Sequence, residues 1–165
     1  MVGRSNVGKS SLINALVRRT LARTSAAPGK TRLANYYRVQ RGAQPPFYLV
    51  DLPGYGYARG GDASAQEFGR LTSAYFERGE QPGVLLLVDA RHPGLDSDVE
   101  TWAWLGTQPC RRRVIGTKVD KLSRAERARH TRDLETLFGP VSITSARTGE
   151  GLDELWKLIA KITAA

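Results

Sequence analysis

The chain has 165 residues, of which 41% are hydrophobic and 25% are charged, the size and composition of one folded domain, which excludes disorder throughout. Its 25 Lys and Arg residues against 16 Asp and Glu give a net charge of +9, which favours a polyanionic partner such as RNA. The only cysteine, Cys110, excludes an internal disulfide and a thiolate metal cluster, so a reducing compartment is favoured and we expect a small buried side chain there.

Apolar segments alternate with segments of helical periodicity, which is typical of a parallel sheet with helices packed on its faces. The predicted strands, in chain order, are Asn35–Gln40, Phe47–Leu52, Val84–Ala90, Arg113–Thr117 and Val141–Thr144. The predicted helices are Lys9–Leu21, Ala65–Arg78, Ser97–Gly106, Arg124–Leu137 and Leu152–Ile162. No repeat or linker divides these elements, so the sequence predicts one α/β domain over residues 1–165.

Residues 22–34, 53–63 and 91–96 lack any periodicity. Loops as long as the first two are uncommon in a compact domain unless they have a function. The longest apolar run, residues 84–88, is far shorter than the roughly 18 residues of a membrane span, and no segment of signal-peptide type precedes residue 3. These features predict a cytoplasmic protein with no membrane partner.

The segment Gly3–Ser10 reads GRSNVGKS and matches the phosphate-binding loop GxxxxGK[ST], and a helical pattern follows it directly. Glycines in such a loop let successive backbone N–H groups point at phosphate oxygens, and the following helix adds the positive end of its dipole. We expect Lys9 to reach the β- and γ-phosphates and the Ser10 hydroxyl to bind Mg²⁺. The motif therefore predicts a nucleotide site.

The segment Asp51–Gly54 reads DLPG and ends an apolar strand. A carboxylate at this point can hold Mg²⁺ through water, and Gly54 lets its own N–H approach the γ-phosphate. In isolation the segment would be a strand followed by a Pro-Gly turn. Coming after a phosphate loop, it is interpreted as part of the site.

The segment Thr117–Asp120 reads TKVD and also ends a strand. A carboxylate accepts hydrogen bonds from the N1–H and N2–H₂ groups of guanine, whereas adenine offers no donor at those positions, and the lysine stem can stack on the ring. The alternative is a Lys-Asp turn before the helix that starts near Ser123. The segment predicts GTP rather than ATP, with the backbone of Thr144, Ser145 and Ala146 as a weaker candidate for contact with the guanine O6.

Six segments together resemble the EngB family of ribosome-biogenesis GTPases. They are GRSNVGKSSLIN at Gly3–Asn14, PGKTR at Pro28–Arg32, DLPGYGYA at Asp51–Ala58, DARH at Asp89–His92, TKVDKL at Thr117–Leu122 and SAR at Ser145–Arg147. The resemblance implies a Ras-like P-loop GTPase, a three-layer α/β fold with a mostly parallel central sheet. It also implies that the Thr31 hydroxyl joins Mg²⁺ when the γ-phosphate is present, and that residues 29–33 close over the nucleotide.

The resemblance further implies a monomeric cytoplasmic switch that binds GTP and GDP and assists late assembly of the large ribosomal subunit, contacting ribosomal RNA and proteins. Roles in cell division and septation are implied as well. The predicted GTP-binding residues are Gly3, Arg4, Ser5, Asn6, Val7, Gly8, Lys9, Ser10, Gly29, Lys30, Thr31, Arg32, Leu33, Asp51, Leu52, Pro53, Gly54, Thr117, Lys118, Val119, Asp120, Thr144, Ser145 and Ala146. Among them Asn6, Lys9, Thr31 and Gly54 are the predicted catalytic residues, and Ser10, Thr31 and Asp51 the predicted Mg²⁺ residues, Asp51 through water.

Two features bear on catalysis. Ras-like enzymes position the attacking water with a glutamine directly after DxxG, but this chain has Tyr55 there, so slow intrinsic hydrolysis is expected. Asn6 resembles the asparagine with which related GTPases hold K⁺ against the phosphates; the alternative is that Asn6 only braces the loop. His92 follows a strand but is rejected as a general base, because phosphoryl transfer needs positioning and charge more than a base.

Several side chains are candidates for partner contact. Arginines occur at Arg111–Arg113 and along a predicted helix at Arg124, Arg127, Arg129 and Arg132, a pattern compatible with RNA contact and with an ordinary solvated face. Tyr55 and Tyr57, in the second irregular loop, are interpreted as exposed recognition aromatics. Trp102 and Trp104 cannot share a helix face, so one is expected in the core and the other facing outward.

The N-terminus departs from the EngB pattern, in which an apolar strand precedes the phosphate loop. Here only Met1 and Val2 precede Gly3, so the first strand is expected to be truncated, through a late start or a trimmed chain, and the fold to be poorly stable. A mitochondrial relative without its presequence is an alternative origin. The functional alternatives are an ATP-dependent kinase, disfavoured by Asp120, and a GTPase module of an Era- or EngA-like or other P-loop system acting on a non-ribosomal partner.

Overall fold

The computed structural model describes residues 1–20, 22, 34–43, 45–55, 69–70, 72–79 and 83–163. Four parallel strands form its central sheet in the order β1-β4-β5-β6. Their bounds are β1 Val2–Gly3, β4 Gly83–Asp89, β5 Arg111–Thr117 and β6 Val141–Ile143. The middle strands carry buried Val, Leu and Ile at residues 84–88 of β4 and 114–115 of β5, as expected for a parallel sheet covered by helices.

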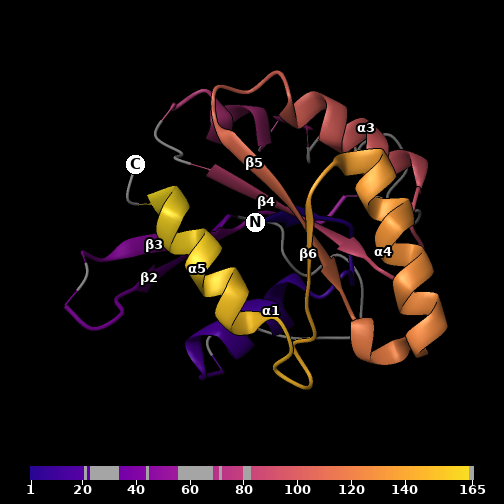
Figure 1. Cartoon of the computed structure of the whole chain (residues 1–165). Helices are drawn as coiled ribbons and strands as arrows, with labels where there is room; N and C mark the ends of the chain where they lie inside the picture. The colour runs from indigo at the N-terminus through magenta and orange to yellow at the C-terminus, as the bar shows by residue number, and fades with distance from the viewer. Residues whose placement is uncertain are drawn as a thin grey trace.

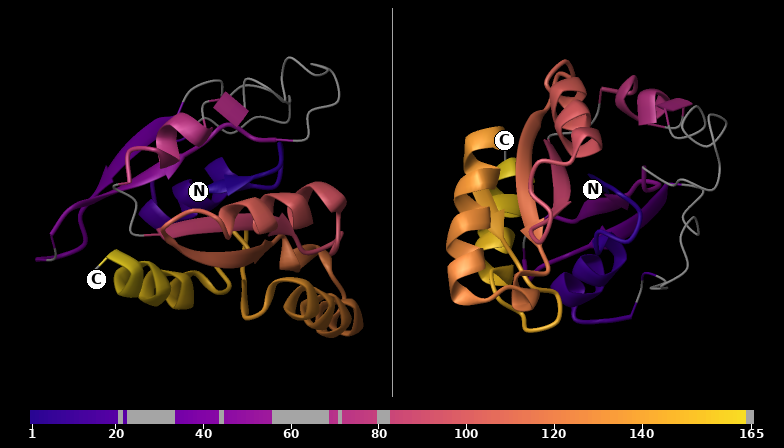
Figure 2. Two further views of the ribbon diagram at one scale, coloured as in Figure 1. Left: turned by 90° about the horizontal axis from the view of Figure 1, so that it is seen from above. Right: turned by 90° about the vertical axis from the view of Figure 1, so that its right-hand side faces the viewer.

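Strands β2 (Asn35–Val39) and β3 (Phe47–Asp51) form an antiparallel pair. This pair joins β1 through Met1, whose ammonium donates to the Val50 carbonyl and whose own carbonyl accepts a hydrogen bond from Leu52 N at 3.1 Å. The six strands therefore run side by side in the order β2-β3-β1-β4-β5-β6. The far end of the β2–β3 pair projects from the rest of the molecule (Figures 1 and 2).

Helices cover both faces of the sheet. The four long helices of the described chain are α1 Lys9–Val17, α3 Asp96–Leu105, α4 Arg124–Phe138 and α5 Leu152–Thr163, and η1 (Val119–Lys121) is a short 3-10 turn. Leu12 and Ile159, from α1 and α5, pack against Leu87 and Ile115 in one core. The second core joins α3 and α4 to the opposite sheet face. Figure 1 shows the same grouping, with α1 and α5 at lower left and α3 and α4 at right.

The predicted three-layer α/β fold is confirmed, and the element ends differ by a few residues. The predicted helix Lys9–Leu21 ends at Val17, because Arg18 turns into the left-handed conformation (φ 53°) and its N–H bonds to Asn14 O. Strand β5 starts two residues earlier than predicted, since Arg111 and Arg112 pair with the first residues of β4. Within the predicted helix Ala65–Arg78, residues 69–70 and 72–76 are helical, and residues 65–68 and 71 lie outside the described residues.

The two tryptophans of α3 depart from the expectation of one core and one outward side chain. Both are half-buried, and each meets a phenylalanine edge-on: Trp102 meets Phe138 at 6.0 Å and Trp104 meets Phe76 at 5.3 Å between ring centroids. They lie on different faces, as their spacing requires. Cys110 is half-buried rather than fully buried. None of the described helices is long and apolar enough to cross a membrane.

Strand β1 is short, as expected, and its two residues pair only with Leu86 and Leu87 of β4. The preceding part of β4, Gly83–Leu85, has no β1 partner in the described chain. A cavity of 330 Å³ lies there, lined by residues that include Met1, Leu49, Leu85, Ile159 and Ile162. The Met1 ammonium at its end is fully buried, and burial lowers its pKa to about 6 from 8.0.

Lengthening β1 is expected to stabilise the protein. Because the folded ammonium has the lower pKa, the unfolded chain binds more protons between about pH 6 and 8, and stability should rise with pH across that window. Adding Val-Ile-Leu before Met1 replaces the ammonium with a peptide N–H and supplies apolar atoms to the cavity. Thermal melts should show a midpoint higher by roughly 10 °C and a weaker dependence on pH between 6 and 8.

A Gly-Ser-Gly extension of equal length is the matched control. It removes the buried charge without adding apolar side chains, so it should flatten the pH dependence, raising the midpoint at pH 6 but leaving it little changed at pH 8. Equal midpoints for all three chains at both pH values would show that neither the cavity nor the buried ammonium limits stability.

Candidate functional site

The phosphate loop joins β1 to α1 and is shaped by backbone conformation. Asn6 and Gly8 both have positive φ, 62° and 108°, and Gly8 is the N-cap of α1. A Cβ on Gly3 would come within 2.7 Å of the Leu87 carbonyl oxygen, so only glycine fits where the loop leaves the sheet. Gly3 is therefore required because a side chain would clash with β4, and Gly8 because its positive φ strains other residues.

The two side chains that end the loop face the interior of the site. Lys9 is buried, and its Nζ donates to the carbonyls of Gly3 (3.1 Å) and Arg4 (3.4 Å). Burial lowers the pKa of Lys9, and the Asp51 carboxylate opposes that shift. An ammonium held by loop carbonyls alone is poorly compensated, so a phosphate group is a favourable partner for it.

Ser10 and Asp51 come together as predicted for a Mg²⁺ site. The Ser10 hydroxyl donates to Asp51 Oδ2 at 3.2 Å, while Asp51 Oδ1 is buried with no hydrogen-bond partner in the described chain. Burial raises the pKa of Asp51, and Lys9, the Met1 ammonium and Ser10 oppose that shift. Mg²⁺ uses few protein ligands and keeps several waters, so a hydroxyl beside a carboxylate with one unpaired oxygen fits this ion.

Gly54 packs directly on the phosphate loop. Its backbone is so close that a Cβ would lie 2.8 Å from both Ser5 N and Ser5 Cα, and Ser5 N donates to Tyr55 O at 2.9 Å. The DLPG segment is therefore in backbone contact with the loop that binds phosphate.

Tyr55 is not the exposed recognition aromatic that was expected. Only 7% of it is exposed, and its hydroxyl donates to Asp98 Oδ1 at 2.7 Å. Burial raises the pKa of Tyr55 far above its usual value, and the negative charge of Asp98 raises it further. Arg4 Nε lies 3.3 Å from the same Asp98 oxygen. These three residues link the phosphate loop, the end of the DLPG segment and the first turn of α3.

The lysine of the TKVD segment crosses the phosphate loop. Lys118 Nζ donates to Asn6 O at 2.6 Å and to Asp89 Oδ2 at 2.9 Å. Asp89, at the end of β4, also accepts a bidentate pair from Arg91. Burial alone would raise the pKa of Asp89, but the hydrogen bonds from Arg91 and Lys118 outweigh it and hold the pKa below its usual range. Lys118 is thus fixed with its stem beside the loop.

Asp120 has one satisfied and one open oxygen. Its Oδ1 accepts a 2.7 Å hydrogen bond from the Ser145 hydroxyl, and its Oδ2 is buried without a hydrogen-bond partner among the described residues, with Arg147 at 3.8 Å. Ser145 and Thr144 are fully buried. A carboxylate oriented by one bond and lacking another is suited to accept the N–H groups of guanine.

The carboxyl ends of β1, β3, β4, β5 and β6 therefore meet at one edge of the sheet, where open α/β folds bind ligands. The contacts of Ser5, Ser10, Lys118 and Thr117 bring together the predicted phosphate segments, residues 3–10 and 51–54, and the predicted base segments, residues 117–120 and 144–146. The predicted residues Gly29, Lys30, Thr31, Arg32 and Leu33, and Tyr57, lie outside the described residues.

The comparisons with known proteins agree with this geometry. A family described as 50S ribosome-binding GTPase matches residues 1–116. The GTP-binding protein EngB of Chlorobaculum tepidum is 43% identical over 98% of this chain and 85% of its own length, and that of Pelotomaculum thermopropionicum is 42% identical over 98% and 83%. The chain belongs to the EngB family of GTP-binding proteins.

Solved structures show the same fold. A crystal structure of an EngB protein has a TM-score of 0.72 at 20% identity, covering 98% of this chain and 95% of that one. Era in complex with MgGDPNP and a 16S ribosomal RNA fragment has a TM-score of 0.83 at 24% identity, covering 98% of this chain and 54% of that one. As an EngB-family P-loop GTPase, the chain binds guanine nucleotide and hydrolyses GTP.

Two residues important to the site were not predicted. Asp89 lies at the end of a buried strand, the same position as Asp51, and that signal could have identified it as a residue of this edge. Asp98 is the third residue of α3, where an acidic side chain is common for helix stability alone. Nothing in the sequence indicates that it reaches Tyr55.

The base-reading role of Asp120 predicts a change in specificity. Asp120→Asn keeps the acceptor for the Ser145 hydroxyl but replaces the open carboxylate oxygen by an amide. We expect GDP affinity to fall roughly 100-fold or more, because two charge-assisted hydrogen bonds are lost, and xanthosine diphosphate, which has a carbonyl at C2, to bind more tightly than GDP. Fluorescent-nucleotide titrations measure both affinities.

Asp133→Asn is the matched control, since Asp133 is exposed on α4. It should bind GDP as the unaltered chain does. Retention of GDP affinity and of guanine preference by Asp120→Asn would contradict the assignment of residues 117–120 to the base.

Proposed function

We propose that this EngB-family chain is a GTP-dependent switch that binds the large ribosomal subunit or its precursor during late assembly and leaves after hydrolysis. The observation that carries the switch is the contact of residues 51–55 with the phosphate loop at Gly54 and Ser5. A γ-phosphate bound near this junction would contact both segments, so GTP and GDP are expected to hold residues 51–55 differently.

Magnesium would be held by Ser10 and, through water, by Asp51, with Thr31 as the third predicted residue. When bound, the ion neutralises charge on the β- and γ-phosphates. Lys9 adds a fixed positive charge to the same oxygens. Because metal binding needs an ionised Asp51, and burial raises the pKa of that group, Mg²⁺ affinity should decline as the pH falls toward the Asp51 pKa.

Hydrolysis is expected to be slow without a partner. Tyr55 stands where Ras-like enzymes have a water-positioning glutamine, but its hydroxyl is engaged by Asp98 and its pKa is raised by burial. It therefore serves neither as a base nor, while that bond holds, as a ligand for the attacking water. Catalysis depends on positioning and on positive charge at the phosphates.

The ribosomal partner is supported by the family description, 50S ribosome-binding GTPase, and by the net charge of +9, which suits RNA phosphates. The second candidate is a GTPase module with a non-ribosomal partner; no observation on the described residues favours it over the first. The implied roles in cell division and septation, a monomeric state and a cytoplasmic location stay predictions.

Co-sedimentation with purified large subunits tests this function. The chain loaded with a non-hydrolysable GTP analogue should be retained, whereas the GDP-loaded chain should not, and retention should fall steeply between 50 and 200 mM salt. Asp120→Asn loaded with the corresponding xanthosine triphosphate analogue should behave like the unaltered chain with the GTP analogue. Retention that ignores the nucleotide, or its absence in every state, would contradict the proposed function.

A potassium ion beside Asn6 is the remaining part of the proposal. The Asn6 side chain is exposed, and its backbone is fixed by a positive φ and by the bond from Lys118 to its carbonyl. An amide oxygen held at the edge of the phosphate loop is a suitable ligand for a monovalent cation. The ion would add positive charge where an arginine finger acts in other GTPases.

Hydrolysis rates in K⁺ and Na⁺ test this ion. The unaltered chain should hydrolyse GTP about tenfold faster in KCl than in NaCl of equal ionic strength, and Asn6→Ala should lose that difference while still binding GDP. Equal rates in the two salts, or full stimulation of the Asn6→Ala variant, would show that Asn6 only braces the loop.

A further inference from the structure

Some arginines of this chain already bind a partner within the fold, and others do not. Arg112 lies 4.0 Å from the centre of the Trp102 ring and donates to the Trp102 carbonyl. Arg127 pairs with Glu150, and Arg111 donates to the Lys161 carbonyl. These side chains, which the sequence made candidates for RNA contact, are thus engaged within the fold. An arginine whose N–H groups already form a hydrogen bond or ion pair within the fold must give up that bond before it can bind a phosphate.

A second group lines a groove of 570 Å³ where the C-terminal end of α1, strand β2 and helix α5 meet. The groove arginines are Arg18, Arg19, Arg38 and Arg41. All four are exposed, and none has a carboxylate within 4.0 Å in the described chain. The one acidic residue of the lining is Asp153. With four positive charges and one negative charge in its lining, this concave surface is strongly basic.

The groove also has an aromatic side. Trp156 of α5 is half-buried in its lining, with the Arg41 guanidinium 5.1 Å from the ring centre and Phe47 edge-on at 6.3 Å. An arginine placed over an indole loses less freedom on binding than a free one, and guanidinium and indole planes both stack on nucleobases. Basic side chains with such a stacking platform are the combination that binds unpaired RNA.

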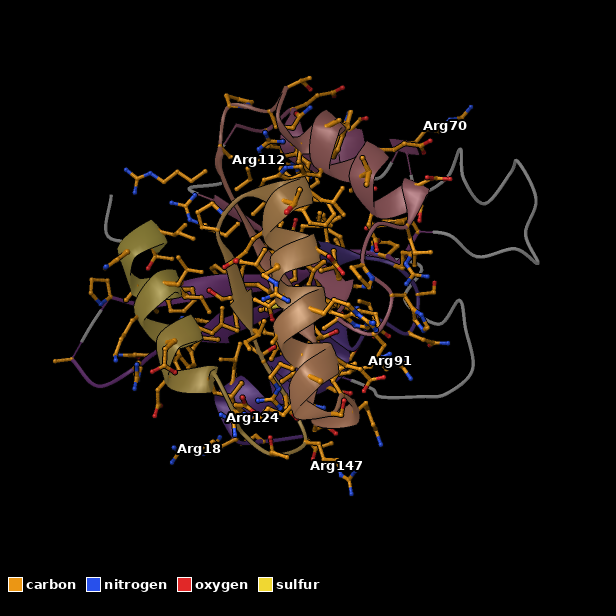
Figure 3. The ribbon with its side chains drawn as sticks, turned by 45° about the vertical axis from the view of Figure 1, so that its right-hand side comes forward. Arg18, Arg70, Arg91, Arg112, Arg124 and Arg147 are labelled. Carbon is orange, nitrogen blue, oxygen red and sulfur yellow. The ribbon has the colours of Figure 1, made fainter. Side chains whose placement is uncertain are left out.

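We propose that this arginine groove binds the phosphate backbone of an unpaired RNA segment, with a base against Arg41 and Trp156. The naming of ribosomal RNA as the natural ligand rests on the proposed function, whereas binding of RNA at the groove does not. Figure 3 shows Arg18, which lines the groove, at the lower edge of the molecule and Arg112 at the opposite end. The groove is therefore separate from the Arg111–Arg113 segment.

The backbone on the α1 side of the groove is held by hydrogen bonds. In the sequence, Arg18 and Arg19 precede and Arg38 follows the predicted Mg²⁺ residue Thr31, which lies outside the described residues. On the α1 side the Asn14 side chain bonds to both the N and the O of Ala22, at 2.7 and 2.8 Å. Arg18 N and Arg19 N also donate to the Asn14 carbonyl, so the backbone of this wall is fixed.

Fluorescence anisotropy with a labelled 12-nucleotide single-stranded RNA tests the groove, using the chain loaded with a non-hydrolysable GTP analogue. Arg38→Gln/Arg41→Gln should weaken binding at least tenfold and make the plot of log affinity against log salt shallower by about 1.4, since each phosphate contact on a single strand contributes about 0.7. Arg38→Lys/Arg41→Lys keeps both charges and should restore the salt slope but only part of the affinity. GDP binding of each variant confirms that it is folded.

The matched control is Arg124→Gln/Arg132→Gln, which removes the same charge from exposed positions on α4. Binding within twofold of the unaltered chain is expected. Equal weakening by both Gln pairs, or weakening by the α4 pair alone, would overturn the proposal in favour of general charge or of the α4 face. Poly-glutamate of the same length, bound as tightly and with the same dependence on Arg38 and Arg41, would overturn it in favour of an acidic protein.

Retention on large subunits separates this inference from the proposed function. If the groove pair loses RNA affinity and the unaltered chain is not retained on subunits, the groove stands and the ribosomal function fails. If the unaltered chain is retained and the groove pair is retained equally with unchanged RNA affinity, the function stands and the groove is overturned.

Discussion

The hydrogen bond from the Thr117 hydroxyl to the Val7 carbonyl, at 2.7 Å, is the contact on which the nucleotide site depends. It joins the end of β5 to the phosphate loop in a buried position, across most of the length of the chain. Because Thr117 begins the predicted base segment, the bond sets the distance between that segment and the predicted phosphate loop. Lys118, fixed between Asn6 O and Asp89, makes a second tie of the same kind.

The carboxylates at this edge of the sheet have different roles, and their hydrogen bonds distinguish them. Asp89 is satisfied on both oxygens by Arg91 and Lys118, so its charge is already compensated within the fold. Asp51 and Asp120 each keep one buried oxygen without a hydrogen-bond partner in the described chain. An unpaired buried acceptor costs roughly 1–3 kcal/mol, and a ligand that supplies the missing donor or cation recovers it. These two open oxygens lie at the positions predicted for Mg²⁺ and for guanine.

Much of this arrangement could be predicted from sequence because it is local. The phosphate loop, the DLPG segment and the TKVD segment each sit where a strand ends, and parallel strands bring such ends together without further information. The ends of α1 and the roles of Tyr55 and Asp98 could not be predicted in this way. A left-handed Arg18 is unusual for a non-glycine residue, and the Tyr55–Asp98 bond joins residues 43 positions apart that carry no pairing signal.

The arginine groove illustrates the same difference between local and long-range information. Runs such as Arg111–Arg113 are conspicuous in sequence, yet Arg111 and Arg112 have partners within the fold. The groove arginines come from two separated segments, and only the meeting of α1, β2 and α5 places them around one surface. Charge density along a chain thus says less about partner binding than whether each charge is already paired in three dimensions.

Tyr55 gives the switch a route to a surface remote from the nucleotide. The Asp98 side chain is almost fully buried, and it accepts from Tyr55 while facing Arg4 of the phosphate loop. If residues 51–55 move with the γ-phosphate, there are two outcomes. Either the Tyr55 hydroxyl leaves Asp98, so that the buried carboxylate loses a hydrogen-bond donor, or α3 moves together with Tyr55. Breaking the bond costs roughly 1–3 kcal/mol, so intermediate positions are disfavoured. We therefore expect two discrete arrangements, one with the Tyr55–Asp98 bond and one without it, rather than a graded shift.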